Sequence, residues 1–135
     1  MTSRPVGAHN TRGFELWRKA MRWQRAVDAA LAPLELTHTQ FLVLTAATAC
    51  VARNADAVLQ RTVAGAAGLD EATTSRITQT LSRRGLIDRG PTSTDKRSWR
   101  ILVTARGKEV EAMAARKVRA VARILFRANV INESD

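Results

Sequence analysis

The chain has 135 residues, a length that fits one domain built around one hydrophobic core. Hydrophobic residues make up 45% of the chain and charged residues 25%, a composition that excludes an intrinsically disordered protein. Lys and Arg number 22 against 12 Asp and Glu, and the resulting net charge of +10 makes nucleic acid the first candidate partner and an anionic membrane surface the second.

The first elements follow a polar segment at the N-terminus. Residues 1–12 contain Pro5 and Gly7, and we expect them to form a flexible arm. From Phe14 to Leu31 apolar residues recur at steps of three and four, which predicts a helix over residues 14–31 with a broad buried stripe. Pro33 should close this helix.

A second helix is predicted to begin after Thr37. The segment Thr37-His38-Thr39-Gln40 has the capping-box pattern, in which the Thr37 hydroxyl accepts from the Gln40 backbone while the Gln40 side chain reaches back. Residues 41–47 are apolar nearly all round, so we expect this helix to lie at the centre of the domain. The polar residues 52–56 are typical of a loop.

Residues 61–84 carry the most informative local pattern. A short Ala-rich helix over residues 62–67 and a turn at Gly68 precede a second helix over residues 70–84. Gly68 suits a left-handed helix end, and Asp70 can accept hydrogen bonds from the free amides of the helix that follows. This is the outline of a helix-turn-helix.

A hairpin is predicted next, because Gly85 should end the helix and residues 86–89 and 99–103 are typical of strands. The turn between these strands has a basic tip. Lys96 and Arg97 could place a cation in the minor groove of DNA, where narrow A·T tracts deepen the negative potential.

Thr104 can cap a last helix over residues 105–128, which is apolar along one side and charged along the other. The first and last helices have more apolar surface than one small domain needs, so we interpret them as a candidate interface. The predicted fold class is mainly α with a small β-hairpin wing.

The helix over residues 70–84 is the candidate reader of DNA. On a wheel of 100° per residue, Thr74, Ile77 and Leu81 share the face that should anchor it. The other face has the chemistry that base edges demand, since Arg can bond guanine bidentately and Gln can pair with adenine. The expected outward residues are Ala72, Arg76, Gln79 and Arg83, with Thr73, Ser75 and Thr80 beside them as phosphate contacts.

Several segments together resemble the multiple-antibiotic-resistance regulator (MarR) family of bacterial winged-helix repressors. They are residues 36–44, 68–77, 81–87, 95–97 and 102–107. The most specific part is the wing pattern Asp95-x-Arg97 followed by Leu102-x-Thr104-x-x-Gly107. Because Asp95 stands beside cations, we expect it to pair with a neighbouring Arg and hold the wing in shape.

The resemblance implies one winged helix-turn-helix domain over residues 13–135, with a DNA-binding lobe over residues 37–104. It also implies a homodimer in which the N- and C-terminal helices interlock and two recognition helices meet a pseudo-palindromic operator. A small aromatic or anionic effector, bound between the dimer helices and the lobe, is a further implication of the resemblance.

The sequence argues against an enzyme, a metal site or a bound cofactor, because it has two histidines, one cysteine, no metal-ligand spacing and no Gly-rich phosphate loop. A lone cysteine, no apolar run of about 18 residues and no signal-peptide core predict a cytoplasmic protein. We interpret Cys50 as a small buried hydrophobe rather than a redox sensor. Trp17, Trp23 and Trp99 are interpreted as core rather than as pocket lining.

A non-specific RNA- or chromosome-binding module remains the alternative function.

Overall fold

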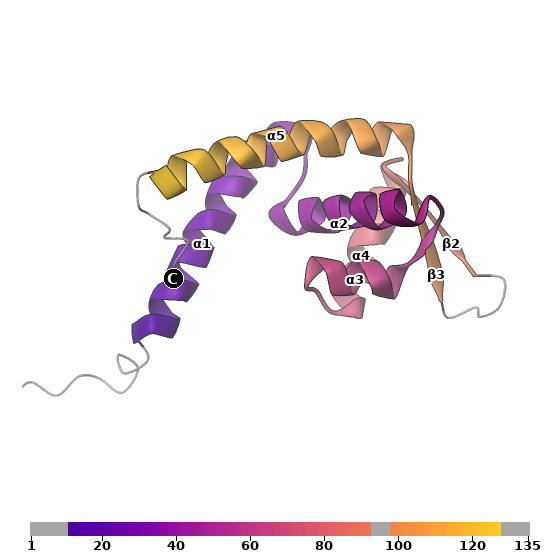
Figure 1. Ribbon diagram of the computed structural model, residues 1–135, viewed down its shortest axis with the longest axis horizontal. Coiled ribbons are helices and arrows are strands. Elements are labelled where there is room, and N and C mark those ends of the chain that lie inside the picture. Colours follow the sequence, from indigo (N-terminus) through magenta and orange to yellow (C-terminus); the bar gives the residue numbers. More distant parts are fainter. Residues whose placement is uncertain (1–10, 93–97, 128–135) are drawn as a thin grey trace, which may run out of the picture.

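The structure is a computed structural model that describes residues 11–92 and 98–127. The elements are α1 (Thr11–Leu31), the 3₁₀ helix η2 (Ala32–Leu34), α2 (His38–Asn54), β1 (Val58–Leu59), α3 (Gln60–Ala67), α4 (Glu71–Arg83), β2 (Ile87–Pro91), β3 (Trp99–Val103) and α5 (Ala105–Arg127). The long helix α5 runs across one side of the molecule, above α2 and on past α1, while β2 and β3 form a hairpin at the far end (Figure 1). The predicted mainly α fold with a small β wing is confirmed.

The start of α1 differs from the prediction, whereas its end agrees with it. The helix begins at Thr11, so residues 11 and 12 belong to it rather than to the expected arm, and residues 1–10 lie outside the described residues. It ends at Leu31, and Pro33 stands in the 3₁₀ turn that follows, in agreement with a stop at this proline. Glu35 then adopts a left-handed conformation, with φ of 56°, that turns the chain toward α2.

The capping box of α2 is confirmed. The Gln40 amide donates to Thr37 Oγ1 at 3.1 Å, and the Thr37 amide donates to Gln40 Oε1 at 3.0 Å. The expected loop over residues 52–56 is wrong for residues 52–54, because α2 runs to Asn54. The Asn54 side chain donates to the Cys50 carbonyl at 2.7 Å and so supports the last turn, and Ala55 ends the helix in a left-handed conformation.

The sheet has three antiparallel strands in the order β1-β3-β2. The predicted hairpin is present, with Ile87 opposite Val103 and Pro91 opposite Trp99, although β2 extends past the expected end at residue 89. The short strand β1, in which Val58 pairs with Ile101, was not predicted. A two-residue strand has no alternation of apolar and polar residues to detect.

The helix α2 lies at the centre of the domain, as predicted, and it contributes a large share of the core. Its buried side chains include Phe41, Val43, Leu44, Ala46, Ala47 and Cys50. They pack with buried residues from the other elements, namely Val27, Leu31, Val63, Leu81, Leu86, Ile87, Ile101 and Val110.

A single residue, Thr104, joins β3 to α5. Its hydroxyl donates to the carbonyls of Gly85 and Leu86, at 2.7 and 3.1 Å, and accepts from the Gly107 amide at 2.9 Å. The predicted cap of α5 is thereby confirmed. Gly107 is buried against Leu86, and a Cβ atom added at Gly107 would lie 1.9 Å from the Leu86 carbonyl oxygen.

We therefore expect Gly107→Ala to destabilise the protein by about 1 to 3 kcal/mol, because a backbone carbonyl must move to admit the methyl group. The matched control is Gly65→Ala in α3, where nothing lies within 4 Å of the new Cβ atom. This control should stabilise the helix by roughly 0.5 to 1 kcal/mol. Urea unfolding of both variants measures the difference, and equal free energies of unfolding would contradict the close approach at Gly107.

Candidate nucleic-acid interface

The turn between α3 and α4 is built as the sequence predicted. Gly68 ends α3 with a φ of +73°, and Asp70 caps α4. One carboxylate oxygen of Asp70 accepts from the Thr73 amide at 2.7 Å and the other from the Thr73 hydroxyl at 2.9 Å. These two hydrogen bonds lower the pKa of Asp70, with the amide contributing most. Asp70 is therefore ionised at neutral pH. Its negative charge lies at the positive, N-terminal end of the α4 dipole and stabilises the helix there.

The inner face of α4 is wider than expected. Thr74 and Leu81 are fully buried and Ile77 is half-buried, in agreement with the predicted anchoring face. Thr78 is also fully buried, which the helical wheel did not single out. The Thr78 hydroxyl donates to Gln60 Oε1 at 2.6 Å, so a polar contact holds this part of α4.

The outward face of α4 carries exposed side chains at every position where the sequence placed them. These residues are Ala72, Arg76, Gln79 and Arg83. Each of the two arginines donates to a threonine hydroxyl three residues earlier in the helix, at 3.5 Å for Arg76 and 3.3 Å for Arg83. Their guanidinium groups are therefore held along the helix surface rather than folded onto the core.

The three flanking hydroxyls are half-buried and already have partners inside the protein. The Thr73 hydroxyl donates to Asp70, and the Thr80 hydroxyl donates to the Arg76 carbonyl at 3.2 Å. Ser75 Oγ accepts from the Gln79 side chain at 3.3 Å. A phosphate contact from these three residues remains a prediction. Because a phosphate oxygen accepts hydrogen bonds, the Thr73 and Thr80 hydroxyls would have to give up their present acceptors to donate to it.

Arg89 in β2 connects the sheet to α4, a role that no sequence pattern indicated. Its Nε donates to Gln60 Oε1 at 2.9 Å, and its Nη2 donates to Ser75 Oγ at 3.1 Å. The guanidinium carbon lies 3.6 Å from the centroid of the Trp99 ring, a close cation–π contact. Burial lowers the pKa of Arg89.

The contact between Arg89 and Trp99 could have been predicted only if the pairing of β2 with β3 had been known. Arg89 pairs with Ile101, so Trp99, two residues earlier, is a diagonal neighbour on the same face of the sheet. This places Trp99 in a polar cluster rather than in the plain core that its sequence context suggested. The wing residues Asp95, Lys96 and Arg97 lie outside the described residues, and their roles remain predictions.

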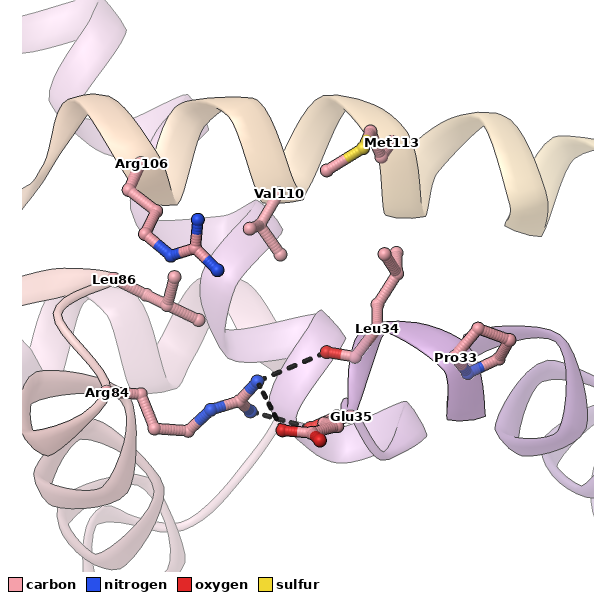
Figure 2. Close-up of a pocket in the computed structure, with 8 residues that line it drawn as sticks. All are labelled: Pro33, Leu34, Glu35, Arg84, Leu86, Arg106, Val110 and Met113. Atoms are coloured by element: carbon pink, nitrogen blue, oxygen red, sulfur yellow. Dashed lines mark hydrogen bonds and ion pairs between the residues drawn. The ribbon is translucent and has the colours of Figure 1, made fainter.

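A cavity of about 450 Å³ separates η2 and the end of α4 from α5. Figure 2 shows two arginines directed toward it, with an apolar wall formed by Leu34, Leu86, Val110 and Met113. Arg84 donates to the carbonyls of Glu35 and Leu34 at 2.6 and 3.1 Å, so it is held in place. Arg106 has no hydrogen-bond or ion-pair partner in the part of the chain that the structure describes. An apolar wall beside such a cation suits an amphipathic anion.

In the described part of the chain, the other chemically active side chains do not gather into a site. Among residues 11–92 and 98–127, no three His, Cys, Asp or Glu side chains come together as metal ligands. The His38 amide donates to Asp28 at 2.6 Å, and burial lowers the pKa of the His38 imidazole. Cys50 is buried. No helix within the described ranges is long and apolar enough to cross a membrane.

Comparison with known proteins gives a consistent set of relatives. The uncharacterised HTH-type transcriptional regulator YdcH of Bacillus subtilis (strain 168) is 31% identical over 128 residues, covering 95% of this chain and 86% of the relative. A MarR-family regulator from Rhodococcus sp. RHA1 superposes with a TM-score of 0.78 at 28% identity, over 98% and 87% of the two chains. No family model matches the sequence.

Two further solved structures carry ligands. CouR from Rhodococcus jostii RHA1, bound to p-coumaroyl-CoA, has a TM-score of 0.73 at 30% identity and covers 86% of this chain and 78% of its own. A variant of MarR from E. coli, in complex with operator DNA, has a TM-score of 0.76 at 20% identity, over 93% and 87% of the chains. The last likeness establishes a shared fold.

Proposed function

Because this chain belongs to the MarR family of winged helix-turn-helix transcriptional regulators, we propose that it binds an operator in double-stranded DNA as a homodimeric repressor. A small aromatic or anionic effector would release it. The observation that carries the proposal is the outward face of α4, on which Arg76, Gln79 and Arg83 stand exposed together.

The geometry of this face suits the major groove. Arg76 and Arg83 are one heptad apart, about 10 Å along the helix, which corresponds to about three base-pair steps. Both side chains are held along the helix by threonine hydroxyls, and small Ala72 at the helix start allows close approach to the bases. The same fold is bound to operator DNA in the E. coli MarR variant, which supports DNA as the partner.

Arg76→Ala tests sequence reading directly. We expect it to weaken binding to an operator, found by genomic binding-site mapping, by about 1 to 3 kcal/mol more than binding to a random duplex of equal length. The loss is selective because a bidentate contact with guanine is missing only on the operator. Fluorescence anisotropy at fixed salt measures both affinities.

Arg61→Ala is the control for Arg76→Ala, since Arg61 is an exposed cation on α3 outside the α4 face. It should leave the ratio of operator to random affinity unchanged. Equal losses for Arg76→Ala on both duplexes would favour the non-specific nucleic-acid-binding module instead.

Exposed apolar side chains on the two terminal helices support the homodimer. Phe14 is 53% exposed and Leu16 and Trp17 are each 57% exposed on α1, while Ile124 on α5 is 67% exposed. Phe14 and Trp17 stack with ring centroids 6.1 Å apart. The expectation that Trp17 is a core residue is therefore wrong for the single chain, and a second copy would cover this side chain.

We expect light scattering at micromolar concentration to give twice the chain mass of 14.8 kDa. Trp17→Glu should give the mass of one chain, because a carboxylate in an apolar interface is strongly disfavoured. Glu15→Gln, on the same exposed turn of α1, is the control and should stay dimeric. A wild-type protein with the mass of one chain would rule out the homodimer.

The cavity beside α5 is the proposed effector site. An aromatic carboxylate could lay its ring against Leu86 and Val110 and its carboxylate on Arg106, the cation that has no partner within the described ranges. Binding of p-coumaroyl-CoA to CouR, which shares this fold, supports a ligand with an aromatic ring.

Benzoate is the probe for this site. It should raise the melting temperature of the wild-type protein in a saturable way and lower its affinity for the operator. Arg106→Gln should abolish both effects, whereas Lys108→Gln, at an exposed position two residues further along the same helix, should keep them. If benzoate affects the two variants equally, it either binds at another site or does not bind, and the proposed effector site is wrong.

A further inference from the structure

Most of the positive charge lies away from the DNA-binding lobe. α1 and α5 together carry twelve Lys and Arg against four Asp and Glu, a net charge of +8. Residues 32–104, which include α4 and the wing, carry nine against six, a net charge of +3. The proposed operator contact therefore accounts for the smaller part of the net charge of +10.

The charge on α5 is concentrated in what we call the arginine stripe. The stripe consists of Arg116, Arg119, Arg123 and Arg127, all of them exposed. On a helical wheel the four positions fall within roughly 80° of one another. The buried side chains of α5, such as Val110 and Ala114, lie on the other side of the helix. This half of α5 projects away from β2 and β3 (Figure 1).

Neighbouring members of the stripe repel one another along the helix. Arg116 and Arg119 are three residues apart, and each of the following pairs is four residues apart, which are spacings at which like charges repel on a helix. No Asp or Glu lies three or four residues from any member. Within the described ranges none of the four has a hydrogen bond or an ion pair. A surface that serves only solubility has positive and negative side chains interspersed. The stripe has positive side chains alone, which suits an anionic partner.

The partner chemistry follows from the way α5 packs. An amphipathic helix binds a membrane by burying its apolar side in the lipid, but the apolar side of α5 packs against α1 and α2. The homodimer would cover side chains such as Ile124, which lie off the stripe. Arginine forks match phosphate oxygens, and the stripe is about 16 Å long, enough to follow several phosphates of a duplex.

We propose that the arginine stripe of α5 binds the phosphate backbone of a second DNA duplex, so that the protein joins two DNA segments. This inference rests on the proposed function for the first segment, which α4 would occupy. Contact with the second segment would depend on charge and not on sequence, because the stripe offers phosphate ligands without a helix end or wing to enter a groove.

The test is capture of a second duplex. Operator duplexes of about 20 base pairs, long enough for two half-sites, are fixed to beads and saturated with protein, and a fluorescent random duplex is then added. The variant Arg119→Gln/Arg123→Gln removes two stripe charges. The variant Lys108→Gln/Lys117→Gln removes two charges from the same helix outside the stripe, so the net charges match.

The stripe variant should capture the second duplex at least several-fold less than the wild type, and the control variant should capture it as well as the wild type. In solution titrations with random duplex, the slope of log affinity against log salt should fall by about 2 for the stripe variant alone. The melting temperature of the stripe variant should not fall, because the substitutions relieve repulsion.

Equal capture by the two variants, no capture by the wild type, or a preference of the stripe for anionic vesicles over DNA would each overturn the proposal. Affinity for the short operator duplex is scored separately and should be unchanged in both variants. If the wild type shows no operator preference, the proposed function fails, and the titrations with random duplex still compare the stripe with its control.

Discussion

One buried amide oxygen, Oε1 of Gln60, sets how α4 lies against the sheet. It accepts from the Thr78 hydroxyl of α4 and from the Arg89 guanidinium of β2, so α3, α4 and the wing share one acceptor. Gln60 is 8% exposed and Thr78 is fully buried, and a polar group that loses its partner at such a site is strongly penalised. Arg89 adds a bond to Ser75 on α4 and a stacked contact with Trp99. Directional bonds thus fix the angle between helix and wing more narrowly than apolar packing alone would.

The features that the sequence predicted well are those whose partners lie within a few residues. The capping box at Thr37, the cap at Asp70 and the cap at Thr104 each join atoms three residues apart, and all three are present. The outward face of α4 was found because helical periodicity needs no knowledge of the rest of the fold. Gln60 and Arg89 were missed because they lie 29 positions apart and meet only once the sheet forms. The walls of the cavity beside Arg106 likewise come from distant segments, so only the family resemblance could suggest a pocket there.

The distribution of charge over the molecule was the property that the sequence predicted least well. A net charge of +10 suggested nucleic acid, yet the total says nothing about where the charge lies. The structure separates two groups of arginines with different settings. Arg76 and Arg83 each donate to a threonine hydroxyl on the outward face of α4. In the arginine stripe, every charged residue three or four positions from a member is another arginine. The first arrangement suits sequence reading, and the second suits a diffuse electrostatic contact.

The single-residue connection at Thr104 has a mechanical consequence. α5 has 23 residues, so it is a rod about 34 Å long. Thr104 is the pivot at which it joins the lobe, and its buried residues Val110 and Ala114 pack into the core beyond that pivot. A rotation of about 10° at this pivot swings the far end of the rod by about 6 Å. The hydrogen bonds of Thr104 to Gly85 and Leu86, and the close seat of Gly107, act as a stop against that swing. In the proposed homodimer, the distance between the two lobes would therefore depend on Thr104 and Gly107 together with the packing of α5 on α2.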